Sequence, residues 1–145
     1  MIGLLQRVTD AAVEIDGRRV AAIGPGLLVL VGVRPTDDAA AAVRLLERML
    51  RYRLFADQAG KMNLSLLETQ GGLLLVPQFT LAADTHKGLR AGFSTAAPPA
   101  LGRSLFEALV EAARARRPKV ETGVFGAHMR VSLTNDGPVT FWLES

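Results

Sequence analysis

The sequence predicts an α+β protein with a mixed or largely antiparallel sheet and two main helices. Short apolar and β-branched runs lie between turn signals at both ends of the chain. Two segments rich in Ala, Leu and Arg carry apolar residues at helical spacing and separate these runs. The resulting order is strands, helix, strands, helix, strands, which favours α+β over alternating α/β. With 145 residues, 49% of them hydrophobic, we expect one domain spanning residues 1–145.

The first part of the chain predicts three strands. Residues 4–15 contain β-branched side chains and end at the dipeptide 16–17, Asp-Gly, which is a strong hairpin signal. Residues 18–23 then return beside the first strand. After the turn at 24–26, residues 27–33 are almost continuously apolar, which is typical of a strand buried on both faces.

The first helix follows this buried strand. Thr36 can cap its N-terminus, and Asp37 and Asp38 favour the positive end of the helix dipole. Helical spacing predicts a core-facing stripe of Ala39, Val43, Leu46 and Leu50.

The middle of the chain contains short strands and one long loop. Residues 53–55 form a candidate short strand that turns at 57–60. Residues 73–76 are a second continuous apolar strand, which enters residues 77–81. The long loop at 82–97 is a candidate functional segment, because long loops in compact domains often carry function.

The second helix starts at Pro98-Pro99. Its inner face is predicted to hold Leu101, Leu105, Leu109 and Ala112. Arg114, Arg116 and Arg117 close it before Pro118, either as cations that suit the helix C-terminus or as RNA contacts. Residues 119–122, 128–134 and 139–143 complete a strand-rich end, with a turn at 135–138.

Composition excludes several classes of function. The chain has no cysteine, which rules out disulfides, thiolate catalysis and iron–sulfur clusters. The N-terminus lacks the order of a signal peptide, and the apolar run at 27–33 is too short to span a bilayer, so we expect a cytoplasmic protein without a membrane partner. A net charge of +3 permits an RNA partner without requiring one.

Conventional catalytic motifs are missing from the sequence. His86 and His128 lack metal-ligand spacing, so we expect no metal, and His86 is predicted to be an exposed loop residue. There is no nucleophile elbow, Walker loop or dinucleotide-binding glycine pattern, so we expect no cofactor.

Two short segments remain as candidate sites. In Pro77-Gln78-Phe79-Thr80-Leu81, polar residues interrupt an apolar strand end, which fits either ordinary strand alternation or a site. In Asn135-Asp136-Gly137-Pro138, four turn-forming residues make either a plain turn or a locked cis bond with directed carbonyls. The residue pattern alone leaves both pairs of alternatives open.

Eight short stretches, taken in order, form a more specific pattern: Gln6-Arg7-Val8, Gly26-Leu27-Leu28-Val29-Leu30, Gly60-Lys61-Met62-Asn63-Leu64-Ser65, Gln78-Phe79-Thr80-Leu81, Ala96-Ala97-Pro98-Pro99, Val120-Glu121-Thr122-Gly123, Phe125-Gly126-Ala127 and Asn135-Asp136-Gly137-Pro138-Val139-Thr140. Together they resemble the D-aminoacyl-tRNA deacylase family over essentially the whole chain. The resemblance implies a homodimer with a barrel-like intersubunit sheet. It also implies hydrolysis of the ester between a D-amino acid, or glycine, and the 3'-terminal adenosine of tRNA.

The resemblance also implies roles for individual residues. Gly137 and Pro138 match a Gly-cisPro motif that enters the partner's pocket, meets the α-amino group and leaves no room for an L side chain. Arg7 holds that motif, to which Asn135 also belongs.

The catalytic side of the pocket is implied to consist of Gln78, Phe79 and Thr80. Backbone N–H groups near Phe79 would face the scissile carbonyl. The resemblance favours assistance from the tRNA's own ribose hydroxyl, with Thr80 either supporting or dispensable. For tRNA binding we expect Phe125 and Met129 to border the adenine. Lys87 and Arg90, in the long loop beside this segment, are expected to contact the RNA backbone.

Two positions depart from the family pattern. Pro77 stands where Ser is usual, which opens the alternative of a related editing deacylase with relaxed chirality, although Arg7, Phe79 and Val139 match the D-specific group. Residues 90–93, Arg-Ala-Gly-Phe, replace the more usual Arg-Pro-Ser-Phe. A further alternative is a non-catalytic RNA- or DNA-binding module of the same fold.

Overall fold

The computed structural model describes residues 1–117 and 119–145, so the predicted helix-ending Pro118 lies outside the described residues. The helices of the described part are α1 (Ala39–Arg51), α2 (Leu66–Thr69) and α3 (Pro99–Arg114), with a 3₁₀ turn η1 (Phe79–Ala82). Its strands are β1 (Ile2–Ile15), β2 (Arg18–Ile23), β3 (Gly26–Gly32), β4 (Phe55–Ala56), β5 (Met62–Leu64), β6 (Gly72–Pro77), β7 (Val120–Thr122) and β8 (Arg130–Glu144). No helix among these residues is long and apolar enough to cross a membrane.

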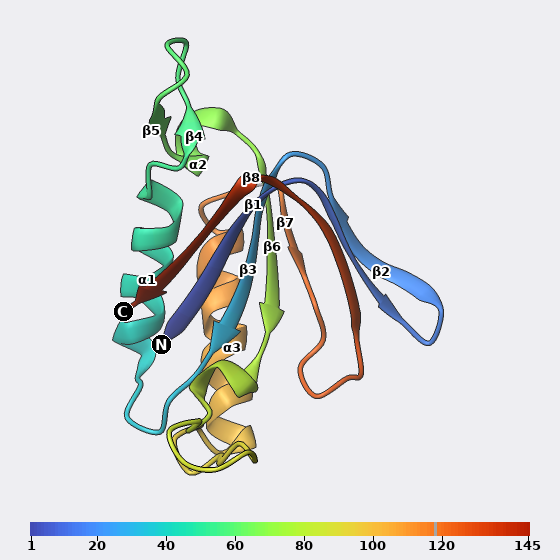
Figure 1. Cartoon of the computed structure of the whole chain (residues 1–145), viewed down its shortest axis with the longest axis vertical. Coiled ribbons are helices and arrows are strands. Elements are labelled where there is room, and N and C mark those ends of the chain that lie inside the picture. Colours follow the sequence, from blue (N-terminus) through green and yellow to red (C-terminus); the bar gives the residue numbers. More distant parts are fainter. Residues whose placement is uncertain (118) are drawn as a thin grey trace.

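The main sheet is mixed, as predicted. Its strand order is β2-β1-β3-β6-β7, and β8 pairs with the other edge of β1. The long β1 is antiparallel to β2, β3 and β8, whereas β3, β6 and β7 run parallel to one another. The strands β4 and β5 form a separate hairpin that protrudes from the top of the molecule (Figure 1).

The sheet curls into a nearly closed barrel, because β2 at one end contacts β6 and β7 at the other. Its inner face encloses one apolar core, whereas α1 and α3 lie together on its outer face and cover a second core (Figure 1). Successive residues of β3 alternate between the two cores, with Leu28 inside and Leu27 and Val29 under the helices. This explains the continuous apolar run of β3 and confirms that it is buried on both faces.

The start of α1 differs from the prediction. Asp38, rather than Thr36, is the N-cap, and its carboxylate accepts a hydrogen bond of 2.7 Å from the Ala41 N–H. Asp37 does not cap the helix, because its carboxylate accepts hydrogen bonds from the Met1 ammonium and the Arg34 N–H. The helix therefore begins two residues later than a Thr36 cap would place it.

The buried faces of the two helices are wider than the predicted stripes. In α1, Leu46 and Leu50 are buried as predicted, but Ala39 and Val43 are exposed. Each helix packs against both the sheet and the other helix, so pairs of adjacent positions are buried together. The buried positions are Ala41, Ala42, Leu45, Leu46, Met49 and Leu50 in α1, and Gly102, Leu105, Phe106, Leu109, Val110 and Ala113 in α3.

Arg117 is buried rather than displayed at the end of α3. Its Nη1 donates to the Leu66 carbonyl at 2.9 Å, and its Nη2 donates to the Gly71 carbonyl. Burial lowers the pKa of this guanidinium. The side chain fastens the segment after α3 to the turn before β6. The alternative that Arg117 contacts RNA is therefore wrong.

The C-terminal region is one long strand rather than two strands joined by a turn. Thr140 of β8 pairs with Gln6, and Asn135 pairs with Val8, so residues 136–139 have only one residue opposite them and bulge from the sheet. The short strand predicted at 53–55 instead occupies 55–56, and two short elements, α2 and η1, were not anticipated.

Candidate active site

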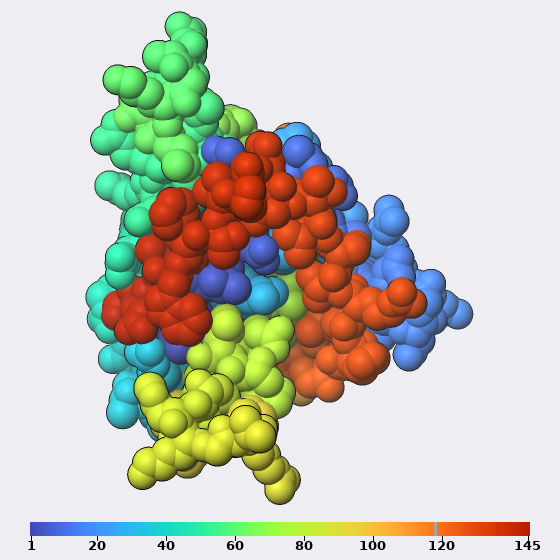
Figure 2. Space-filling view, viewed as in Figure 1, coloured from blue at the N-terminus to red at the C-terminus, as the bar shows by residue number. Residues whose placement is uncertain are grey.

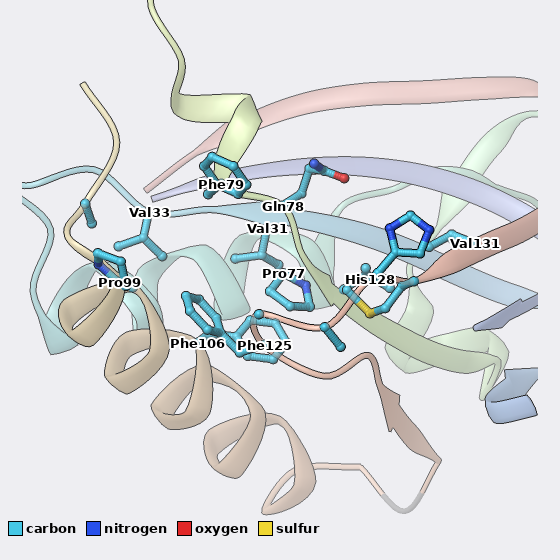
Figure 3. Close-up of a pocket in the computed structure, with 16 residues that line it drawn as sticks. Val31, Val33, Pro77, Gln78, Phe79, Pro99, Phe106, Phe125, His128 and Val131 are labelled. Carbon is cyan, nitrogen blue, oxygen red and sulfur yellow. The ribbon is translucent and has the colours of Figure 1, made fainter. Parts of the chain in front are cut away.

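A cavity of about 440 Å³ lies at the carboxyl ends of β3 and β6. Because these strands are parallel, their carboxyl ends meet at the same edge of the sheet. The α3 helix and residues 125–131 close the other sides (Figure 3). The lining residues are Val31, Val33, Val76, Pro77, Gln78, Phe79, Ala97, Pro99, Gly102, Phe106, Phe125, Gly126, Ala127, His128, Met129 and Val131.

The strand geometry of β6 explains how Pro77 is tolerated. The Leu73 N–H donates to Lys119 on the β7 side, whereas the Gln78 N–H donates to Val31 on the β3 side. Alternation along the strand directs the nitrogen of Pro77 toward the β7 side, where the last ladder partner of β6 is Thr122, opposite Leu75. Pro77 is the last residue of β6 and lies beyond the last residue that pairs with β7, a strand-end position where proline is tolerated, and its ring becomes part of the cavity wall.

Directly after Pro77 the chain turns into η1. The N–H groups of Phe79 and Thr80 open this 3₁₀ turn and therefore have no acceptor within it; the first internal donor is Leu81, which bonds to the Gln78 carbonyl at 3.2 Å. Gly32 permits the turn to pack this closely, because a Cβ there would lie 3.0 Å from the Cβ of Leu81. Two main-chain donors are thus left unused beside the cavity.

The side chains of this turn are also ordered. The Gln78 amide donates a 2.6 Å hydrogen bond to the Thr80 hydroxyl, so the Thr80 proton is directed toward another acceptor. The Phe79 ring is 56% exposed and packs against Phe93, with the ring centroids 5.1 Å apart. This segment reaches the surface on the face that β8 crosses (Figure 2).

The opposite wall is built from residues 123–129. The Met129 sulfur accepts a hydrogen bond from the Val124 N–H at 3.3 Å. Gly123 allows this contact, because a Cβ there would lie 2.8 Å from that sulfur and 3.3 Å from the Pro77 ring. Among the described lining residues, only Gln78 and His128 carry polar side chains, so the cavity is mainly apolar.

A second cluster surrounds the bulge at 136–139. The Arg7 guanidinium donates to the Asp136 carbonyl at 2.9 Å and to the Leu54 carbonyl at 2.7 Å. The Asn135 side chain closes the base of the bulge, accepting from the Val139 N–H at 2.6 Å and donating to the Thr140 hydroxyl at 2.9 Å.

Gly137 and Pro138 lie at the exposed tip of this bulge, and the peptide bond between them is cis. Gly137 has φ +146°, and a Cβ on it would lie 2.6 Å from the Val139 side chain. Only glycine fits this backbone conformation without displacing Val139.

The long loop carries Lys87 and Arg90 away from the cavity. Two backbone hydrogen bonds between Asp84 and Gly92, of 2.8 and 2.9 Å, close its neck. Lys87 and Arg90 are exposed beyond this neck, and His86 is exposed as predicted.

The structure therefore distributes the expected site residues over three places. One cavity is lined by Pro77, Gln78, Phe79, Phe125 and Met129, and Thr80 is hydrogen-bonded to Gln78 at its edge. Arg7, Asn135, Gly137 and Pro138 form the separate bulge, and Lys87 and Arg90 lie on the loop. Sequence reasoning missed the contribution of Val31, Val33, Pro99, Gly102 and Phe106, whose apolar character reads as ordinary core.

Fold and site together define an α+β protein with a mainly apolar cavity, beside which the N–H groups of Phe79 and Thr80 have no acceptor within their turn. The family model described as D-Tyr-tRNA(Tyr) deacylase matches residues 4–144, and the chain belongs to this family.

The chain is 67% identical over 144 residues to a D-aminoacyl-tRNA deacylase of Thioalkalivibrio sulfidiphilus, covering 99% of this chain and 97% of that protein. It is 62% identical over 145 residues to a D-aminoacyl-tRNA deacylase of Azotobacter vinelandii, covering 100% of both. Among solved structures, a c-Myc DNA unwinding element binding protein matches with a TM-score of 0.96 at 35% identity, covering 100% of this chain and 99% of that one.

Proposed function

We propose that this chain hydrolyses the ester bond between a D-amino acid, or glycine, and the 3'-terminal adenosine of tRNA. Membership of the deacylase family and high identity to proteins named D-aminoacyl-tRNA deacylase support this activity. The observation that carries the proposal is the apolar cavity beside the free N–H groups of Phe79 and Thr80. Its volume of about 440 Å³ falls within the usual range for small-molecule sites.

In the proposed mechanism the cavity receives the terminal adenosine, bordered by Phe125 and Met129. The ester carbonyl then lies against the N–H groups of Phe79 and Thr80, which stabilise the negative oxygen that forms as water attacks the carbonyl carbon. The bond to the ribose oxygen breaks, and that oxygen takes the proton that the attacking water loses. Since an aminoacyl ester is already reactive, orientation and oxyanion stabilisation suffice without a strong side-chain base.

The bulge at 136–139 is proposed to act on the site of a second copy. Among the described residues of one chain, neither Gly137 nor Pro138 lines the cavity. A role for these two residues in substrate selection therefore requires the cavity of another subunit. In a homodimer the bulge would enter the partner's cavity and place its carbonyls against the α-amino group of the substrate. An L side chain would then collide with main-chain atoms, which gives selection by exclusion.

Exposed apolar side chains support a dimer. Trp142 on β8 and Phe79 on η1 are 48% and 56% exposed. Burial of these apolar side chains against a second subunit would stabilise a dimer. Lys87 and Arg90 are proposed to contact the phosphates of the tRNA acceptor end, and the cytoplasm is the compartment that supplies this substrate.

Relaxed chirality, the alternative prompted by Pro77, has less support. Pro77 lies at the end of β6, beyond the last residue paired with β7, where proline is tolerated, so its presence has a structural account that does not depend on the substrate. A second candidate function is nucleic-acid binding without catalysis, which the similarity to a protein titled c-Myc DNA unwinding element binding protein favours.

The test is a deacylation assay on matched D-Tyr-tRNA, L-Tyr-tRNA and glycyl-tRNA. We expect release of D-tyrosine and glycine and sparing of the L-form. Equal hydrolysis of L-Tyr-tRNA would contradict the selection mechanism and support relaxed chirality. Tight tRNA binding without turnover of any ester would support the second candidate.

A further inference from the structure

Phe125 lines two cavities in the described structure. The larger, of about 440 Å³, is the proposed nucleoside site, and a smaller one of about 240 Å³ runs along α3. Both are lined by Phe125 and Phe106. Phe125 is partly buried and packs against the apolar core under the helices, and its position beside the two cavities also depends on contacts with α3.

Those contacts come from two adjacent residues of α3. Gly102 lets the ring lie on the helix backbone, because a Cβ there would be 3.2 Å from the Cζ of Phe125. The Arg103 guanidinium lies 5.1 Å from the ring centroid, a distance typical of a cation–π contact. Its Nη2 also reaches the Phe125 carbonyl at 3.4 Å, so Arg103 touches both the ring and the backbone of this residue.

Arg103 does not itself line the larger cavity. Its side chain is 54% exposed, and its nearest carboxylate is that of Glu107, 3.9 Å away in the next turn of the helix. It lines the smaller cavity together with Phe125. We therefore expect an effect of Arg103 on a nucleoside in the larger cavity to pass through Phe125, with which it has two contacts.

We propose that Arg103 is a positioning residue that holds Phe125 as a wall of the nucleoside cavity. This inference rests on the proposed function. Phe79, where the ester carbonyl is proposed to bind, lies on a different side of the cavity from Phe125 (Figure 3). Loosening Phe125 should therefore weaken substrate binding more than it slows the chemical step.

The test compares KM and kcat for D-Tyr-tRNA in matched variants. Arg103→Met keeps the aliphatic stem but loses both contacts, so KM should rise about 3- to 10-fold while kcat stays within about twofold. Arg103→Lys keeps a cation and should recover part of the loss. Arg114→Met is the control, because Arg114 lies on the same helix, is 53% exposed, pairs with Glu111 and also lines the smaller cavity. Among the described residues, the cation–π contact and the hydrogen bond to Phe125 come from Arg103 and not from Arg114.

A double variant separates positioning from direct RNA binding. If Arg103 acts through Phe125, adding Arg103→Met to Phe125→Ala should change KM by less than about twofold. If Arg103 instead binds a phosphate, the increase in KM persists in the Phe125→Ala background, and the inference is overturned.

The remaining outcomes are distinguishable. Wild-type protein that hydrolyses no D-Tyr-tRNA would refute the proposed function and this inference with it. Normal wild-type hydrolysis with an unchanged KM for Arg103→Met would refute the inference alone. A rise in KM for Arg114→Met as large as for Arg103→Met would also refute it, because general charge attraction would then account for the effect.

Discussion

Arg7 connects two distant backbone segments through hydrogen bonds to the Asp136 and Leu54 carbonyls. The resemblance of the sequence to the deacylase family singled out Arg7 and the Gly-Pro pair. It gave no sign of the Leu54 contact, because residues 7, 54 and 136 become neighbours only when β1, β8 and the segment before β4 are assembled. Pro77 is the opposite case, since the structure places this departure from the family pattern at the end of β6, beyond the last residue paired with β7, where proline is tolerated.

Replacing Arg7 with lysine should impair the enzyme although the charge is kept. Lysine cannot offer donors in the planar geometry that bridges two carbonyls. We expect kcat/KM for D-Tyr-tRNA to fall roughly 10-fold or more, because the bulge at 136–139 loses its anchor. Arg19→Lys, an exposed position on β2, serves as control, and an Arg7→Lys enzyme as active as that control would contradict the anchoring role.

Glu144 should make the free energy of unfolding depend on pH. Hydrogen bonds from Arg34 and from the Trp142 indole lower the pKa of Glu144 to about 2. A carboxyl group with a lowered folded-state pKa stabilises the protein above its unfolded pKa, near 4.5, and that contribution disappears as the pH falls toward 2.

Because the Glu144 side chain is 45% exposed, the expected effect is on the order of 1 kcal/mol or less. Denaturant unfolding of Glu144→Gln at pH 7 and pH 3 should show a deficit relative to wild type that narrows at the lower pH. Glu121→Gln, at an exposed position of β7, is the control. A deficit that widens on acidification would contradict the assignment.

At the scale of elements, strong periodic patterns predicted the strands of the barrel and both long helices, but boundaries were less accurate. Several residues near the start of α1 can cap a helix, and only the assembled structure shows that Asp37 is occupied by Met1 and Arg34. The short η1 turn was missed because the polar and apolar residues of 77–81 also fit the ordinary alternation of a strand end. The turn nevertheless creates the free N–H groups on which the proposed site depends.

The cap of α1 can be tested with two neighbouring substitutions. Asp38→Ala removes the acceptor of the Ala41 N–H and should lower the free energy of unfolding by about 1 kcal/mol. Thr36→Ala, at the position that the sequence alone favoured, should cost less than about 0.5 kcal/mol. Equal losses in denaturant titrations of the two variants would show that the cap is not confined to Asp38.

At the scale of the whole molecule, one chain presents two halves of a proposed site that do not meet. The cavity and the free N–H groups occupy the strand ends, and the bulge with Gly137 and Pro138 is exposed beside β1. Sequence resemblance supplied the expectation of a homodimer, and no pattern within a single chain could have shown which surfaces pair. The central claim is that each working site combines one subunit's cavity with its partner's bulge.

Mixed dimers of two inactive variants test this claim most directly. Phe79→Pro removes the proposed oxyanion N–H at the first position of η1, where a proline is tolerated. Gly137→Val adds a side chain at a position where even a Cβ atom would lie 2.6 Å from the Val139 side chain. Each variant alone should be folded by circular dichroism and nearly inactive on D-Tyr-tRNA.

In a hybrid dimer, one site pairs the intact cavity of the Gly137→Val subunit with the intact bulge of the Phe79→Pro subunit. A random mixture of subunits should therefore regain about a quarter of wild-type activity, because half of the dimers are hybrids with one working site in two. A mixture in which hybrids form, yet which is no more active than the two variants measured separately, would contradict a site shared between subunits.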